Sequence, residues 1–288
     1  MLREKNVYTH FVFAVVAVHV LAGDSSAEHP ALQTLRAREE AMSCVAGKGV
    51  VSVEAPTGNG EQWSDSVDFL IAWDGRYRVK KTNKYGTTIN CADGSADYEQ
   101  TGANTLEIHP PDSSAGAVHI QSMLFPEKAI ISPLFEKAES IRLVSEGTTD
   151  NTGAVSYSYV LEMPQDEQLN LLLVFKPTGE LERICIRDNT SPLEMVHLFT
   201  DHVKDKAGAT LPRNYQFFFQ PIGSKRTATA NRQVIVEIKL DMVESGAKAE
   251  GFAPVLEGMA ITDYRKGLPW LKKSSDELVE NLLDNIGL

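Results

Sequence analysis

The sequence predicts a mainly β protein with flanking helices, in which about 10–11 antiparallel strands form one sheet. Apolar and polar residues alternate with a period of two over long stretches, most clearly at residues 234–242. Turn signals such as Asp74-Gly75 separate these stretches. Helical spacing is confined to a segment near each end and one near the middle. A sheet that is apolar on one face must be covered or must close on itself, and the helices are the obvious cover.

The first predicted helix covers residues 29–46. Leu32, Leu35, Glu39 and Met42 share one face of it, at the three-to-four spacing of a helix that packs on something. The glycines at positions 47 and 49 are expected to end it.

Two further helices are expected. A short one is predicted across residues 125–138, inside an otherwise irregular region. The last begins near Ser274, which lies three residues before Glu277 as in a capping box, and ends near Gly287.

The period of two begins at Gly49. Besides residues 49–54, 67–73 and 234–242, strands are expected at residues 76–80, 87–92, 96–100, 104–109, 155–159, 169–175, 181–187 and 213–220. Residues 192–200 are a further candidate strand.

The alternation also determines which side chains share a face of a strand. We expect the apolar faces of two strands to point into one shared interior. These faces are formed by Val67, Phe69, Ile71 and Trp73, and by Val234, Val236, Ile238 and Leu240. The alternation also places Met242 on the same face of its strand.

Residues 1–27 are predicted to be a signal peptide. Arg3 and Lys5 precede an apolar run at residues 11–22, which is shorter than the roughly 20 residues of a spanning helix. Ser25 and Ala27 fit a cleavage site before Glu28, although an uncleaved anchor or a buried strand is the alternative. The predicted mature chain, residues 28–288, is a single domain.

The residues after the apolar run also predict that the mature protein carries no lipid anchor. Leu21-Ala22-Gly23 resembles the start of a lipobox, but Asp24 stands where the lipid-bearing cysteine would be. The mature chain is therefore expected to be free in solution, in the periplasm or otherwise exported.

The charge argues against some partners. The formal net charge is −11, so the chain gains little from neutralising phosphates, and nucleic-acid binding is not expected. Strong attachment to anionic lipid surfaces is disfavoured as well. Arg76, Arg78, Lys80 and Lys81 form a locally basic strand, which is either a solvated face or a contact for anionic headgroups or a partner.

The cysteines Cys44, Cys91 and Cys185 leave two alternatives open. One disulfide can form in three ways, or all three are buried thiols that pack as small apolar side chains. No metal is expected, because no cysteine–histidine cluster has zinc-ligand spacing. His197 and His202 are five residues apart, which places them on opposite faces of a regular strand.

No catalytic constellation is present, and the chain is not expected to be an enzyme or to need a cofactor. The sequence lacks GxSxG, HExxH and a glycine-rich phosphate loop. The carboxylate pairs Asp65/Asp68 and Glu180/Glu182 are ordinary for the solvated face of a strand.

Several segments together resemble the LolA/LolB-like superfamily of outer-membrane lipoprotein carriers, in its long planctomycete type. They are the helix start at residues 32–35 leading into 47–50, the strand–turn–basic strand at 69–78, and Phe252-Ala253-Pro254 followed by residues 258–264. The resemblance implies a half-open β-barrel around a hydrophobic cavity, with helices covering the open face. It also implies a periplasmic carrier for the acyl chains of lipids or lipoproteins.

Under this resemblance, part of the shared interior is the cavity. Its expected lining is Val67, Phe69, Ile71, Trp73, Tyr215, Phe217, Val234, Val236, Ile238 and Leu240. The expected partners are an acyl chain and an envelope protein. The alternatives are an RseB-like sensor module of the same fold and a structural exported protein without a ligand. The chain is longer than the usual carrier, with extra residues around 110–152 and 243–258, and its latching arginine cannot be placed beyond the candidates Arg76 and Arg78.

Overall fold

The computed structural model describes residues 30–54, 62–102, 104–111, 116–149, 153–222, 233–254, 256 and 258–265. The predicted signal peptide and the predicted C-terminal helix lie outside the described residues. Within them the chain forms a 14-stranded sheet and short helices. The helices are α1 (Pro30–Met42), α2 (Val118–Leu124), the π-helix η2 (Glu127–Ile131), α3 (Ser132–Lys137) and the 3-10 turn η4 (Pro164–Asp166).

The strands are short or of moderate length and cover most of the described chain. They are β1 (Cys44–Glu54), β2 (Gln62–Ala72), β3 (Tyr77–Asn83), β4 (Gly86–Ala92), β5 (Asp97–Thr101), β6 (Thr105–His109), β7 (Ser140–Thr149), β8 (Ala154–Met163), β9 (Glu167–Phe175), β10 (Leu181–Asp188), β11 (Leu193–Lys204), β12 (Thr210–Pro221), β13 (Gln233–Ser245) and β14 (Ala260–Asp263).

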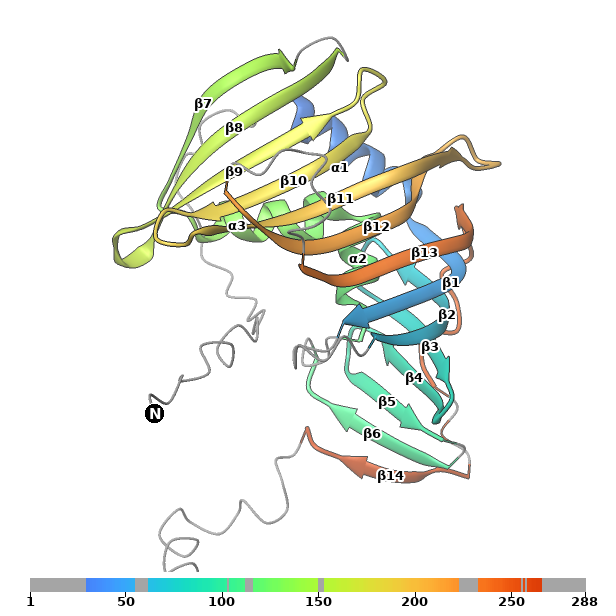
Figure 1. The fold of residues 1–288 in the computed structure, drawn as a ribbon. Helices are drawn as coiled ribbons and strands as arrows, with labels where there is room; N and C mark the ends of the chain where they lie inside the picture. Colours follow the sequence, from blue (N-terminus) through green and yellow to red (C-terminus); the bar gives the residue numbers. More distant parts are fainter. Residues whose placement is uncertain are drawn as a thin grey trace, which may run out of the picture.

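The sheet consists of two meanders joined at β1. Its order is β14-β6-β5-β4-β3-β2-β1-β13-β12-β11-β10-β9-β8-β7, so that β1 pairs with β2 on one side and with β13 on the other. All neighbours are antiparallel except β14, which runs parallel to β6. The sheet is strongly bent but does not close, and β7 and β14 form its two edges (Figure 1). The predicted mainly β class with a half-open antiparallel sheet is therefore confirmed.

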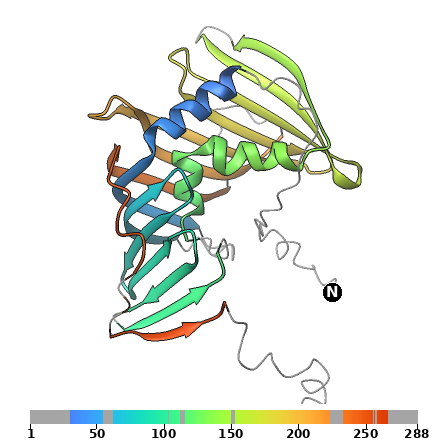
Figure 2. The same ribbon diagram turned by 180° about the vertical axis from the view of Figure 1, so that it is seen from behind.

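The helices cover part of one face of the sheet. Seen from behind, α1 and the helical segment at residues 118–137 lie across the sheet (Figure 2). The principal core fills the space between them, and we call this side the helix-covered face. Smaller apolar clusters lie apart from this core, for example Phe252 packed on Cys44 and Ala72. The predicted cover by helices is thus confirmed for the described residues.

The start of β1 corrects one prediction. The first helix ends at Met42, and Gly47 and Gly49 lie inside β1 instead of ending the helix. Neither position has room for a side chain. A Cβ atom on Gly49 would lie 2.8 Å from the Cα atom of Leu240, and one on Gly47 would overlap the ring of Phe69. The two glycines therefore permit the close approach of β1 to its neighbours where the two meanders join.

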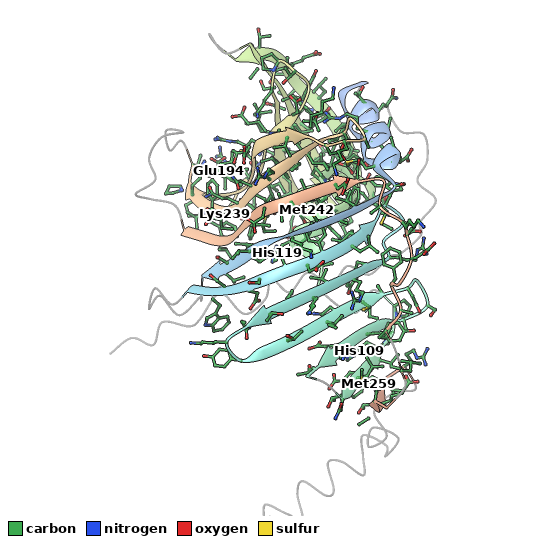
Figure 3. The ribbon with its side chains drawn as sticks, turned by 90° about the vertical axis from the view of Figure 1, so that its right-hand side faces the viewer. His109, His119, Glu194, Lys239, Met242 and Met259 are labelled. Carbon is green, nitrogen blue, oxygen red and sulfur yellow. The ribbon has the colours of Figure 1, made fainter. Side chains whose placement is uncertain are left out.

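A β-bulge in β13 corrects a second prediction. Lys48 pairs with Met242 and Gly49 pairs with Leu240, so Asp241 is an extra residue. The alternation of faces therefore reverses beyond Leu240. Met242 is 45% exposed, and Val243 is buried in the core in its place. Figure 3 shows Met242 on the solvent side of the sheet, near Lys239.

Residues 110–152 are more regular than predicted. They contain α2, η2, α3 and the edge strand β7.

The three cysteines are buried and none is in a disulfide, so the alternative of three buried thiols is confirmed. Burial raises the pKa of the Cys91 thiol to about 11, which keeps it protonated and unreactive at neutral pH.

Candidate functional site

A cavity of about 560 Å³ lies beside α1, within the range typical of ligand pockets. It is enclosed by α1, the end of α2, the turn between β9 and β10, the turn between β11 and β12, and the end of β13. Much of its wall is apolar and continuous with the core, namely Leu35, Met42, Met123, Leu124, Leu181, Phe199 and Leu211. The polar side chains of its wall include Arg38, Glu39, Glu180 and His202.

Arg38 connects α1 to both turns across this cavity. Its Nη1 donates to the carbonyl oxygen of Gly179 at 2.9 Å, and its Nη2 donates to that of Thr210 at 3.5 Å. These two acceptors belong to different hairpins, so one side chain ties the helix to both of them. Arg76, one of the two candidates for a latching arginine, pairs with Asp74, with Nη2 and Oδ2 2.7 Å apart.

Glu39 is buried on the inner face of α1, where it is 1% exposed. Its carboxylate accepts hydrogen bonds from the backbone N–H groups of Glu127, at 2.8 Å, and Lys128, at 3.3 Å. Burial raises its pKa to about 8, against the opposing effect of these two hydrogen bonds. Glu39 is therefore largely protonated at neutral pH.

A second buried carboxylate stabilises the contact between α1 and η2. Glu127 is 1% exposed, and its Oε1 accepts from Arg36 Nη2 at 2.5 Å and from Ser132 Oγ at 2.7 Å. Next to it, Lys128 donates to the carbonyl oxygen of Trp73, and its Nζ lies 4.9 Å from the centre of the Trp73 ring. Polar contacts therefore hold α1 against η2, and η2 against the end of β2.

The protonation of Glu39 predicts a pH dependence. Its pKa is higher in the folded chain, about 8, than its ordinary value of 4.5. The folded state therefore binds more protons than the unfolded state in this range, and stability should fall as pH rises from 4.5 to 8. Urea unfolding of the wild type and of Glu39→Gln measures the effect, because the amide cannot ionise and should remove this slope.

The buried histidines contribute with the opposite sign. Burial lowers the pKa of His197 to about 3 and that of His202 to about 4, so their contribution to stability is lost as pH falls below 6.5. The comparison is therefore cleanest between pH 6.5 and 8. Equal slopes for wild type and Glu39→Gln in that interval would contradict the assignment to Glu39.

The two histidines of β11 lie in different surroundings. His197 shares a 2.7 Å hydrogen bond with the hydroxyl of Tyr215 in the core, and His202 lines the cavity. Asp201 between them has a φ of 51°, and β11 keeps one register with β12 across it. Among the described residues, no group of three or more His, Cys, Asp or Glu side chains could hold a metal ion.

The residues predicted to line a cavity are brought together as one interior. The apolar faces of β2 and β13 meet in the principal core, which confirms the shared interior. The side chain of Val234 lies outside the described residues. Val67, Phe69, Ile71, Tyr215, Val236, Ile238 and Leu240 are buried there, with Trp73 and Phe217 packed against them. None of these residues lines the cavity beside α1. Their role in binding a ligand stays a prediction.

Sequence reasoning missed the cavity beside α1. Its single signal in the sequence was Glu39, a carboxylate on the apolar face of a predicted helix. The hairpin turns that complete the cavity carry ordinary turn residues, such as Gly179 and Gly208, which gave no indication of a site.

The fold and the cavity define a class of protein. In this class, an open, bent β-sheet carries helices on its inner face, and a cavity lies beside one helix, here α1. No family model matches the chain, and no curated protein matches it. Among the described residues, no helix is long and apolar enough to cross a membrane.

Several solved structures are similar to the chain. A domain described as an outer membrane lipoprotein-sorting protein from Vibrio parahaemolyticus is 8% identical, with 76% of this chain and 92% of that chain covered and a TM-score of 0.46. A DUF1329 family protein from Desulfovibrio piger is 10% identical, with 76% and 94% covered and a TM-score of 0.48. A LolA superfamily protein from Nitrosomonas europaea is 7% identical, with 75% and 94% covered and a TM-score of 0.46. All three TM-scores are below 0.5.

Proposed function

We propose that the chain is an exported carrier that binds an acyl chain of a lipid or lipoprotein in the cavity beside α1. The observation that supports this most directly is the cavity itself. Its apolar wall, which includes Leu35, Phe199 and Leu211, continues into the core beneath the helices. Burying a methylene group contributes about 0.8 kcal/mol, so a chain of several methylenes is retained without any specific polar contact.

The contacts that attach α1 to the rest of the chain support a role for this helix as a movable cover of the cavity. Leu32, Leu35 and Met42 pack into the core, but the contacts that orient the helix over the cavity are the polar ones of Arg36, Arg38 and Glu39. Such bonds can be exchanged for bonds to water at small net cost. A shift of α1 would widen the cavity toward the core, which would then accept more of an acyl chain.

Filling the cavity tests the proposal. Ala209 lines the cavity and packs against the core, whereas Ala37 is exposed on α1 and does not line the cavity. We expect the wild type to bind a fluorescent fatty acid saturably, and Ala209→Phe to lower the affinity by about tenfold or more because the ring occupies the site. Ala37→Phe is the matched control and should bind like the wild type.

A wild-type chain that binds no acyl probe, and that carries no lipid in detergent-free mass spectrometry, would refute the proposed carrier function.

The proposal that the protein is exported rests on the predicted signal peptide at residues 1–27. Secreted material should begin near Glu28 in N-terminal sequencing. An intact Met1 in that material would contradict cleavage.

A further inference from the structure

The buried carboxyl group of Glu39 joins α1 to the start of η2. Its two oxygens accept hydrogen bonds from the backbone N–H groups of Glu127 and Lys128, the first two residues of η2. Glu39 and Pro126, the residue before η2, both belong to the wall of the cavity beside α1. This contact is therefore part of the attachment of the helix that covers the cavity.

The cations around Glu39 are bound to other acceptors. Arg36 pairs with Glu127, with Nη2 and Oε1 2.5 Å apart, whereas Arg38 and Lys128 donate to backbone carbonyl oxygens. Within the part of the chain that the structure describes, no ion pair joins any of these cations to Glu39. An ionised Glu39 would thus be a buried charge without a paired cation, next to the second buried carboxyl group of Glu127.

Two titratable side chains of the hairpins complete the polar part of the cavity wall. Burial lowers the pKa of His202 to about 4, so the imidazole is neutral. For Glu180, the effect of burial is outweighed by hydrogen bonds, led by the one from Thr178, so its pKa is lowered and it stays a carboxylate. Neither group changes its charge between pH 6.5 and pH 8, and Glu39 is the described residue of the wall that titrates there.

We propose that Glu39 is a proton switch for the cover of the cavity: the neutral acid holds α1 on η2, and ionisation of Glu39 accompanies the shift of α1 that admits an acyl chain. This inference rests on the proposed carrier function and its movable cover. A neutral carboxyl group is tolerated at this depth, whereas a carboxylate is stabilised when the helix moves and water reaches it. Loading therefore releases a proton, and by linkage a higher pH favours loading.

The expected direction follows from the two states of Glu39. Its pKa is about 8 while α1 is seated, and it returns toward the ordinary value of 4.5 when the carboxyl group is hydrated. Between these values the empty protein binds one proton more than the loaded one, so the affinity for an acyl ligand should rise by at most about tenfold per pH unit. Below pH 6.5 the buried His202 acts with the opposite sign, because its pKa is lowered instead of raised.

The methyl ester of a fluorescent fatty acid tests the switch, because the charge of this probe does not change with pH. The affinity of the wild type should rise by about tenfold from pH 6.5 to pH 8. Glu39→Gln should bind with an affinity that stays constant over this interval, because the amide cannot ionise. Glu40→Gln, at an exposed position of the same helix, is the matched control and should keep the rise.

A second measurement needs no variant and stays decisive if Glu39→Gln does not fold. Calorimetric titration of the wild type with the ester, in two buffers that differ in their enthalpy of protonation, counts the protons released per bound ligand. About one proton should be released near neutral pH. Binding without proton release, or the same rise of affinity in Glu39→Gln, would overturn the switch and leave the carrier function standing. No binding of the ester at any pH would refute the carrier function, and the switch with it.

Discussion

Gly49→Ala is expected to lower the free energy of unfolding by about 3 kcal/mol or more. Gly49 lies in β1, the strand that joins the two meanders, and a Cβ atom there would lie 2.8 Å from the Cα atom of Leu240 as well as against the carbonyl oxygen of Lys239. Backbone atoms cannot turn away as a flexible side chain can. The strand must therefore separate from β13, which disrupts the pairing between the two halves of the sheet.

The control for this substitution is Gly147→Ala in the edge strand β7. A Cβ atom on Gly147 meets nothing within 4 Å, and its backbone does not adopt a positive φ. Chemical denaturation of both variants should show a large loss for Gly49→Ala and a change of at most about 0.5 kcal/mol for Gly147→Ala. Similar values for the two would show that the close approach of β1 and β13 is not a constraint on the fold.

Ile238→Asn is expected to destabilise the chain by about 3–5 kcal/mol, through the lost apolar packing and a buried amide without a partner. Ile238 is 0% exposed and lies in the core beneath the helices, outside the lining of the cavity beside α1. Solvent cannot hydrate an amide at this depth. Urea unfolding measures the loss, and binding of the fluorescent fatty acid is measured on the fraction that remains folded.

The outcome separates two roles for the strand faces of β2 and β13. If Ile238 is core, the folded fraction of Ile238→Asn should bind the probe with nearly wild-type affinity. A variant with little loss of stability but strongly reduced probe binding would instead show that Ile238 lines a hydrated ligand cavity. That result would move the binding site from α1 to the centre of the sheet.

The sequence by itself determined the class of fold and the faces of the longest strands. Alternation with a period of two is a local property, because successive side chains of a strand point to opposite sides whatever the strand pairs with. Phe69 and Ile238 were therefore placed correctly in one interior. Helical spacing likewise identified α1, and Glu39 on its apolar face was visible as an anomaly.

Only the tertiary structure decided the rest. The exposure of Met242 depends on a bulge, which lies where β13 pairs with Lys48 and Gly49 of β1. The cavity depends on Arg38 of α1 meeting Gly179 and Thr210, residues 141 and 172 positions away in the chain. Register, bulges and contacts between distant turns arise from packing between segments, and no local pattern of residues encodes them.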